Sequence, residues 1–197
     1  MSARRAQTLV LATRNPHKLK EFKRLLAPFG IAVEPLAEEI VLPPEDGSTF
    51  AENALVKART AAAESGRPAI ADDSGIEADA LGGAPGVRSA RYAGPSASDD
   101  ANLEKLMHEA PVGSGLRYVC ALAFVDGSQG VEELVFGECR GRLAEAPRGT
   151  GGFGYDPAFL PDEDGQHRTM AELSNEEKDR ISHRGRAARA LVALLEG

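Results

Sequence analysis

The order of apolar and polar positions at the start of the chain predicts a strand, a polar loop and a helix. Leu9-Val-Leu-Ala12 is a short apolar run of the kind that forms a buried strand, and Thr13-Arg-Asn-Pro16 supplies turn residues directly after it. The apolar residues that follow recur on one face of a helix: Leu19, Phe22, Leu25, Leu26 and Phe29. Asn15 is placed to cap this helix, with Pro16 at its first position and Gly30 as its terminator.

A second helix is expected over residues 49–65, because Thr49 and Glu52 form a capping box and a glycine follows the alanine-rich segment. Residues 68–71 are apolar and predict a short strand. Residues 72–95 are rich in turn formers and predict a long loop.

The second half of the chain combines a helix, a hairpin and a helical C-terminal part. Ser98 is expected to cap a helix, and residues 117–125 and 131–139 are strand-like runs joined by a turn-rich segment. Ser174 and Glu177 form a second capping box, ahead of an apolar stripe made of Ala187, Leu191, Leu194 and Leu195. A strand and helix at the start and an antiparallel hairpin later predict an α/β fold with a mixed sheet.

Composition narrows the class of protein. A chain of 197 residues that is 42% hydrophobic can bury a sizeable core, and its length suits one domain, 1–197. Its 23 basic and 30 acidic residues give a formal charge of −7, which disfavours non-specific binding to nucleic acid or an anionic membrane. Neither cysteine has a zinc-like spacing to other ligands, and no apolar run could span a bilayer or act as a signal core. We therefore expect a cytoplasmic protein in which any phosphate ligand meets local positive charge.

The first candidate site is the segment Thr13-Arg-Asn-Pro-His-Lys18, a polar loop at the end of a strand and the start of a helix. Backbone amides at a helix N-terminus attract anions, and Lys18 would add a mobile positive charge. Taken alone, the segment is also what an ordinary capped helix with a solvated lysine requires, because capped helix starts are common.

The second candidate site is Ala71-Asp-Asp-Ser-Gly75, with two adjacent carboxylates after an apolar strand. Adjacent side chains of an extended chain point to opposite faces, so Asp72 and Asp73 are expected to divide their roles. Carboxylate oxygens suit magnesium, which usually takes one or two carboxylates together with substrate phosphates, and Glu45 is a candidate second carboxylate. A turn in which the aspartates accept backbone hydrogen bonds is the alternative.

Two further segments offer contacts for a nucleoside. Gly149-Thr-Gly-Gly-Phe-Gly-Tyr-Asp-Pro157 contains G-x-G-x-x-G but lacks the strand and helix of a dinucleotide fold, so we interpret it as a loop in which Phe153 could face a base. Lys178 and Ser182-His-Arg184 carry donors suited to phosphate or carbonyl oxygens. A glycine-rich surface loop and a solvated helix face are the alternatives.

Taken in order, these segments resemble the inosine triphosphate pyrophosphatase family over nearly the whole chain. The matching motifs are T-x-N-x-x-K at 13–18, G-x-T-F-x-E-N-A-x-x-K-A at 47–58, A-D-D-S-G at 71–75, L-G-G-A-P-G-V-x-S-A-R-Y at 81–92, G-T-G-G-F-G-Y-D-P at 149–157 and S-H-R at 182–184. The resemblance implies an α/β fold with a long curved mixed sheet and flanking helices, two lobes around a deep cleft, and a homodimer. It also implies an enzyme that hydrolyses non-standard purine nucleoside triphosphates such as ITP, dITP and XTP to monophosphate and pyrophosphate, cleansing the nucleotide pool.

The resemblance assigns roles to individual residues. Asp73 would hold Mg²⁺ and act as general base, whereas Glu45 is a candidate second metal ligand on the chemistry of its carboxylate alone. The residues implied to bind substrate are Thr13, Arg14, Asn15, Pro16, His17, Lys18, Lys57, Ser74, Phe153, Gly154, Tyr155, Asp156, Lys178, His183 and Arg184. Two positions depart from the family pattern: Arg14 stands where some members have glycine, and Pro44 stands where others carry a carboxylate, which leaves the second metal ligand open.

The exocyclic group at position six of the purine separates the substrates. Hypoxanthine, xanthine and guanine present an oxygen acceptor there and adenine presents an amino donor, so donors at His183 and Arg184 would reject adenine. The sequence leaves open how strongly guanine is excluded and whether Asp72 or Asp73 is the base. One alternative is a related pyrophosphatase for modified pyrimidine nucleotides, against which the S-H-R segment argues. A second is a nucleotide-binding module without catalysis, which the intact A-D-D-S-G segment disfavours. A third is a nucleic-acid-binding protein, which the excess of acidic residues disfavours.

Overall fold

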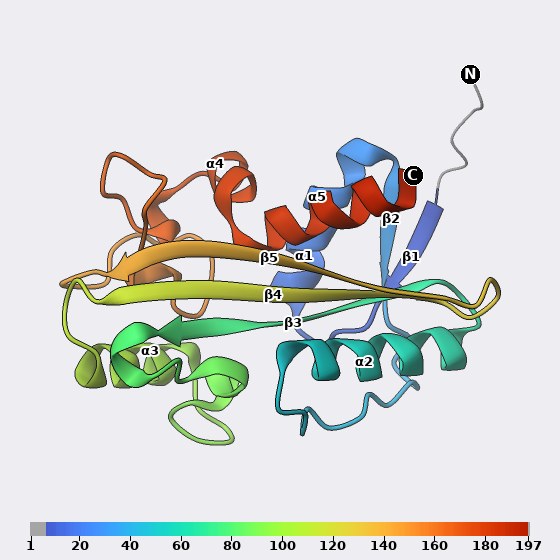
Figure 1. The fold of residues 1–197 in the computed structure, drawn as a ribbon, viewed down its shortest axis with the longest axis horizontal. Helices are drawn as coiled ribbons and strands as arrows, with labels where there is room; N and C mark the ends of the chain where they lie inside the picture. The colour runs from blue at the N-terminus through green and yellow to red at the C-terminus, as the bar shows by residue number, and fades with distance from the viewer. Residues whose placement is uncertain (1–6, 197) are drawn as a thin grey trace. The chain divides into compact units, whose positions relative to one another are not determined.

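The computed structural model describes residues 7–196 of the chain and shows a six-stranded sheet flanked by helices (Figure 1). The strands are β1 (Gln7–Leu11), β2 (Ile31–Pro35), β3 (Ala69–Ala78), β4 (Gly115–Asp126), β5 (Val131–Leu143) and β6 (Phe159–Pro161). The helices are α1 (Pro16–Leu26), α2 (Phe50–Ser65), α3 (Asp99–Glu109), α4 (Asn175–Ile181) and α5 (His183–Glu196). The two arginines near the N-terminus lie outside the described residues.

The sheet has the strand order β2-β1-β3-β4-β5-β6. Strand β1 pairs in parallel with β2, where Leu9 lies opposite Val33, and in parallel with β3. Strand β5 pairs antiparallel with β6. The sheet is therefore mixed, and the predicted α/β class is confirmed.

The chain divides into two compact units. Unit 1 contains the described residues up to Asp73, together with Cys120–Phe136 and the chain from Ala187 onward, and unit 2 contains Ser74–Val119 and Gly137–Arg186. The single domain and the deep cleft between two lobes stay predictions.

The core of unit 1 joins the strands to helix α1 and to the later part of α5. Its buried residues are Leu9, Leu11, Phe22, Leu25, Leu26, Ile31, Val33, Ile70, Cys120, Leu122, Phe124, Ala187, Ala188, Leu191 and Val192. Helix α1 lies on one face of the unit 1 strands and α2 on the other, with small buried residues at Ala54, Ala58 and Ala61 (Figure 1). The strands of unit 1 are thus covered on both sides, and polar side chains on either face meet a helix.

The core of unit 2 is built from the other ends of the long strands, α3 and the loops after β5. Its buried residues are Ile76, Ala78, Leu103, Leu106, Ala110, Leu116, Tyr118, Cys139, Leu143, Ala144, Tyr155, Ala158, Phe159, Met170 and Leu173. Tyr118 and Phe159 pack with ring centroids 4.5 Å apart.

The helix starts confirm the predicted capping. The Asn15 side chain accepts hydrogen bonds from the first turn of α1, and Thr49 and Glu52 form a reciprocal capping box at α2. Ser98 caps α3, and Ser174 and Glu177 form the box at α4. These side chains satisfy amides that would otherwise lack partners at the helix ends.

One expectation about the elements is wrong. The predicted loop at 72–95 begins too early, because β3 continues to Ala78 and carries Asp72 and Asp73 in its middle rather than after its end. Lysines from the neighbouring helices offset the charge of these two aspartates, so the strand tolerates them. The pattern did not predict strand β2. The C-terminal part is helical, as predicted, and consists of two helices, α4 and α5, separated at Ser182.

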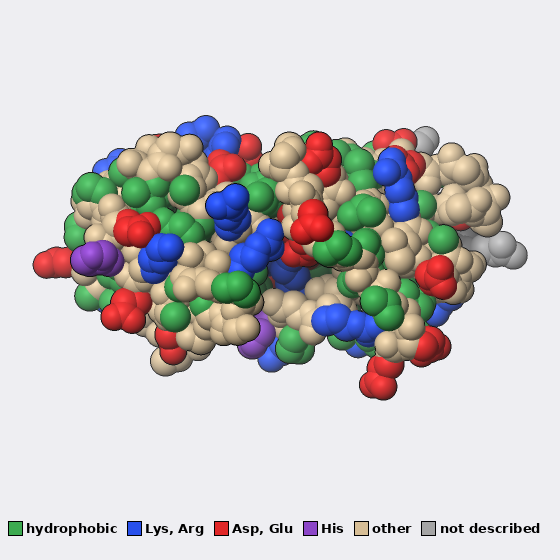
Figure 2. All heavy atoms as spheres, turned by 90° about the horizontal axis from the view of Figure 1, so that it is seen from below, with side chains coloured by type: hydrophobic (Ala, Val, Ile, Leu, Met, Phe, Trp, Pro, Cys, Tyr) green, Lys and Arg blue, Asp and Glu red, His purple; other side chains and the backbone are tan. Residues whose placement is uncertain are grey.

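The surface agrees with the mixed charge of the chain. On the face shown in Figure 2, basic and acidic side chains are interspersed with apolar ones instead of forming a continuous basic surface. None of the helices in residues 7–196 has the length and hydropathy that crossing a membrane requires. Cys120 and Cys139 are both buried free thiols.

Candidate active site

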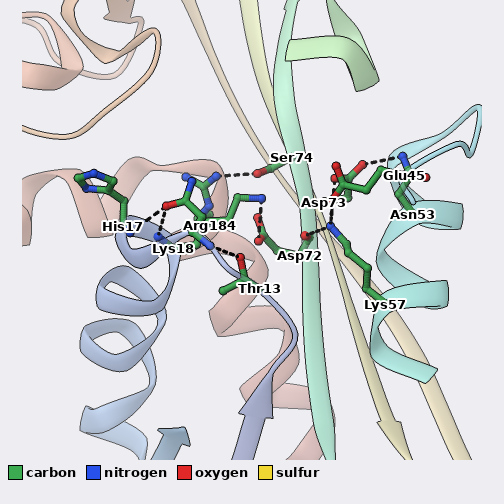
Figure 3. A network of polar contacts seen from close by, with 11 residues as sticks. Thr13, His17, Lys18, Glu45, Asn53, Lys57, Asp72, Asp73, Ser74 and Arg184 are labelled. Atoms are coloured by element: carbon green, nitrogen blue, oxygen red, sulfur yellow. Dashed lines mark hydrogen bonds and ion pairs between the residues drawn. The ribbon is translucent and has the colours of Figure 1, made fainter. Parts of the chain in front are cut away.

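Two neighbouring carboxylates in the middle of β3 face opposite sides of the unit 1 strands (Figure 3). The Asp72 carboxylate forms an ion pair with the Lys18 ammonium of α1 at 3.0 Å. The Asp73 carboxylate forms an ion pair with the Lys57 ammonium of α2 at 3.3 Å. Both aspartates are buried, with 1% and 6% exposure. The two side chains point to opposite faces, as predicted, because the alternation of a strand sends them to different helices, and the division of their roles stays a prediction.

Lys57 is the centre of the group on the α2 side. Its ammonium donates to the backbone oxygen of Asp72 at 2.9 Å and to Asp73 Oδ1 at 3.3 Å, and it also bonds Glu45 Oε1. The lysine is 4% exposed, whereas the Glu45 side chain is 36% exposed. Two carboxylates, one buried and one accessible to solvent, therefore converge on one cation.

Asn53 belongs to the same group, although the sequence analysis did not assign it a role. Its amide nitrogen donates to Asp73 Oδ2 at 3.1 Å, and its amide oxygen accepts the Gly47 backbone amide at 2.8 Å. A Cβ at residue 47 would lie 2.6 Å from this oxygen, so only glycine lets the loop approach. The signal was present in the sequence, because Gly47 and Asn53 both belong to the motif at 47–58.

The pKa directions describe how these charges influence one another. Burial raises the pKa of Asp73 and Glu45 raises it further, while Lys57 and Lys18 offset only part of the shift. Burial lowers the pKa of Lys57, but the charges of Asp73, Glu45 and Asp72 outweigh burial and the net shift is upward. The pKa of Glu45 is lowered, because Lys57 outweighs the effect of burial. Asp73 is thus a carboxylate whose affinity for a proton is increased, which suits a general base.

The segment 13–18 forms the cap of α1. The Asn15 side chain accepts the amides of His17 at 2.8 Å and Lys18 at 3.3 Å, and the Thr13 hydroxyl accepts the Asn15 amide at 3.1 Å. The His17 ring points away from Asp72 and Asp73, whereas the Lys18 side chain reaches Asp72 (Figure 3). Of this segment, the structure therefore brings Lys18 directly to the carboxylates.

Arg14 has a different environment from its neighbours. Its guanidinium donates to four backbone oxygens of one loop, those of Leu36, Ala37, Glu38 and Ile40. This loop leads to Glu45 along the chain. The contacts indicate that Arg14 organises the loop, and its expected contact with substrate stays a prediction.

In unit 2, Asp156 is the centre of a second buried group. Its Oδ2 atom accepts the Lys178 ammonium at 2.8 Å and the Phe153 amide at 2.9 Å, and its Oδ1 atom accepts the Tyr118 hydroxyl at 3.1 Å. The ring of His183 stacks on Tyr118 at a centroid distance of 4.6 Å. Asp156 and Lys178 are 3% and 5% exposed, so the carboxylate balances a buried ammonium.

The glycine-rich loop is held by contacts within unit 2. The Gly154 amide donates to Asp99 at 2.9 Å, and the Tyr155 hydroxyl donates to the Ser89 backbone oxygen at 2.7 Å. At Gly152, which has a φ of 70°, a Cβ would lie 2.0 Å from the Asp156 carboxylate, so glycine is needed for the close approach. The segment is a loop, as predicted, and not a dinucleotide-binding turn.

Two cations lie over the Phe153 ring. The Arg184 guanidinium is 5.0 Å and the Lys178 ammonium 5.6 Å from the ring centroid, within the range of cation–π attraction. Arg184 also donates to the Ser74 hydroxyl at 2.6 Å. The structure therefore gathers the predicted unit 2 residues into one polar and aromatic group.

Comparison with known proteins identifies the family of this chain. A model of the Ham1 family matches residues 9–194. The chain belongs to this family. The resemblance to the inosine triphosphate pyrophosphatases is thereby confirmed.

Relatives in the Ham1 family cover almost the whole chain. A dITP/XTP pyrophosphatase of Frankia alni is 51% identical over 95% of this chain and 96% of its own length. A dITP/XTP pyrophosphatase of Symbiobacterium thermophilum is 53% identical over 94% of both chains. The solved structure of a HAM1 protein from Coxiella burnetii is 39% identical, with a TM-score of 0.84, over 96% of this chain and 98% of that one.

The carboxylates of unit 1 have the chemistry that Mg²⁺ requires, without forming a complete metal cage. An oxygen of Glu45 and an oxygen of Asp73 form ion pairs with the same cation, the Lys57 ammonium. In the described part of the chain, no group of three or more His, Cys, Asp or Glu side chains could hold a metal by itself. Such a donor set fits Mg²⁺, which commonly combines one or two carboxylates with phosphate oxygens and water.

Proposed function

We propose that this protein hydrolyses non-standard purine nucleoside triphosphates, such as ITP, dITP and XTP, to the monophosphate and pyrophosphate. The names of the relatives support the reaction, because two dITP/XTP pyrophosphatases are 51% and 53% identical to this chain over 96% and 94% of their own lengths. The observation that carries the proposal is the group in β3, where Asp73 is buried, has a raised pKa and faces Lys57 and Glu45. In this group Asp73 can accept a proton, and Lys57 supplies positive charge that attracts phosphate oxygens.

Asp73 is the proposed general base. It accepts a proton from the water that attacks the α-phosphorus, and Asn53 and Lys57 hold its two oxygens in place for that transfer. Asp73 is the better of the two candidates, because its pKa is raised and it shares Lys57 with Glu45, whereas Asp72 faces Lys18 on the other side of the strand. Lys18 binds phosphate oxygens once a substrate competes with Asp72 for its ammonium.

Glu45 and Asp73 are the proposed ligands of Mg²⁺. Bound Mg²⁺ would supply a positive charge that polarises the phosphate oxygens and stabilises the leaving pyrophosphate. Lys57 holds the two carboxylates together, and Arg14 orders the loop that leads to Glu45.

The unit 2 group is proposed to recognise the base. Lys178, His183 and Arg184 offer donors to the six-oxygen of hypoxanthine or xanthine, and Phe153 offers a flat apolar face. An adenine amino group in the same place leaves such donors without an acceptor, which costs about 1–3 kcal/mol for each buried group. Ser74, Gly154, Tyr155 and Asp156 shape this group through the contacts described above.

The proposal extends to the biological setting. An enzyme with this selectivity would cleanse the nucleotide pool in the cytoplasm, where it would act as a homodimer. Size-exclusion chromatography with light scattering tests the dimer independently of the reaction.

A panel of pyrophosphate-release assays tests the proposed reaction. ITP, XTP, GTP, ATP, CTP, UTP and modified pyrimidine triphosphates are compared with and without Mg²⁺, and both pyrophosphate and orthophosphate are measured. The expected result is Mg²⁺-dependent release of pyrophosphate, fastest with ITP and XTP. Orthophosphate as the direct product, or a preference for modified pyrimidines, would contradict the proposal, and triphosphate binding without turnover would indicate a binding module.

A further inference from the structure

Tyr118 lies in the unit 2 group but has no role in the reaction described above. It comes from β4, is 6% exposed, and has its hydroxyl 3.1 Å from Asp156 Oδ1. One face of its ring stacks on His183, with an interplanar angle of 9° and a centroid distance of 4.6 Å. A single buried side chain thus contacts two residues that the proposed function assigns to the base.

The contact with Asp156 controls how that carboxylate is held. The other oxygen, Oδ2, accepts both the Lys178 ammonium and the Phe153 amide. Loss of the Tyr118 hydroxyl would leave Oδ1 without this donor and free the carboxylate to rotate. Lys178 and the Phe153 backbone would then move with it, because they depend on the same carboxylate for their position.

The environment of Tyr118 keeps its hydroxyl protonated, so that it can donate a hydrogen bond. Burial raises its pKa well above the ordinary value, and the neighbouring charge of Asp156 raises it further. A phenol with a raised pKa keeps its proton at neutral pH, so the Tyr118 hydroxyl donates to Asp156.

We propose that Tyr118 is a positioning residue for purine selectivity, which acts through Asp156 on Lys178 and Phe153 and through ring stacking on His183. The inference rests on the proposed function. The proposed function gives Tyr118 no contact with the reacting phosphate, so removal of its hydroxyl should alter recognition of the base and leave phosphate binding unchanged.

The Tyr118→Phe variant tests this role, because it removes the hydroxyl and keeps the ring that stacks on His183. The matched control is Tyr92→Phe, which removes another tyrosine hydroxyl bonded to a carboxylate, that of Glu109, elsewhere in unit 2. We expect Tyr118→Phe to lower the ratio of kcat/KM for ITP to that for ATP by about tenfold, the size expected for one hydrogen bond to a charged group. The control should leave the ratio unchanged.

Inorganic tripolyphosphate separates positioning from a general structural effect. Tripolyphosphate carries linked phosphates and no base, so its inhibition constant against ITP should be the same in wild type and Tyr118→Phe while the KM for ITP rises. An equal rise in both constants would overturn the inference, because it would indicate a loss of structure that affects phosphate binding too.

A double-mutant cycle with Asp156→Asn tests the route of the effect. If Tyr118 acts through Asp156, adding Tyr118→Phe to Asp156→Asn should change the ratio less than twofold further. Full additivity would overturn the proposed route. Wild-type protein that releases no pyrophosphate from ITP would instead contradict the proposed function, whereas active wild type with an unchanged ratio in Tyr118→Phe contradicts the inference alone.

Discussion

Replacement of Lys57 by methionine tests whether one buried ammonium holds the unit 1 site together. Methionine has a similar length and no charge, so the change removes the ion pairs with Asp73 and Glu45 and the hydrogen bond to the Asp72 backbone oxygen. The buried Asp73 carboxylate would then face Glu45 with no cation between them.

The contacts set the size of the expected effect. Removal of one partner from a buried ion pair costs about 3–5 kcal/mol. Glu45 has a side chain that is 36% exposed and can turn toward water, so we expect the lower end, about 3 kcal/mol. For a chain of this length each kcal/mol lowers the Tm by about 2–4 °C, which predicts a fall of about 6–12 °C.

The loss should depend on pH in a defined direction. In wild type the pKa of Lys57 is raised above its usual 10.5, so its contribution is complete below that pH and is lost as pH rises through the raised value. In the variant the two carboxylates repel each other, their pKa values rise above those of the unfolded chain, and the folded protein loses stability as pH increases. The difference in Tm should therefore be larger at pH 8 than at pH 5.

Thermal unfolding followed by circular dichroism at both pH values measures the effect, with Lys20→Met as the control for an exposed lysine of α1. Adding Asp73→Asn to Lys57→Met should recover part of the Tm at pH 8, since it removes the uncompensated charge. A decrease in Tm of less than about 2 °C for Lys57→Met, or no recovery of the Tm in the double variant, would refute the reasoning.

Three further predictions concern turnover, selectivity and loop order. Asp73→Asn should keep the fold by circular dichroism and lose about 10²–10⁴-fold in kcat, because an amide cannot accept the proton from water; a fully active variant would move the base elsewhere. Arg184→Ala, and to a lesser extent His183→Ala, should lower the ITP-to-ATP ratio of kcat/KM about tenfold or more, and an unchanged ratio in both would assign base selection to other residues. Arg14→Ala should make amide hydrogen exchange in residues 36–40 about tenfold faster, with Arg14→Lys intermediate; equal exchange in all three proteins would contradict the role inferred for the guanidinium.

The parts of the fold that depend on local chemistry were predictable from the sequence. A cap needs only a side-chain acceptor a few residues before free amides, so Asn15, Ser98 and the two capping boxes are recognisable without knowledge of the tertiary structure. The hairpin of β4 and β5 likewise depends on two strand-like runs and the turn between them.

The parts that depend on distant partners were not predictable from local pattern. Aspartates are unfavourable inside strands, and β3 continues through this pair because Lys18 of α1 and Lys57 of α2 offset their charges. The motifs marked most of the candidate site residues but did not indicate what each contacts. The contacts of Arg14 with the loop at 36–40 were not predicted, its contact with substrate stays a prediction, and Tyr118 lacked any motif to mark it.

The alternation of Asp72 and Asp73 along β3 makes the site sensitive to insertion and deletion in a way that composition does not reveal. Removing one residue from the strand ahead of them would leave every acidic and basic group in the protein and exchange the helix that each aspartate faces. Asp73, the proposed general base, would then lie on the side of Lys18, and Asp72 on the side of Lys57 and Glu45. Laboratory evolution or domain recombination that changes the length of residues 69–73 should therefore eliminate activity, while loops elsewhere absorb changes of length. In this chain the number of residues in β3 ahead of Asp72 determines which helix each aspartate faces, whatever the identity of those residues.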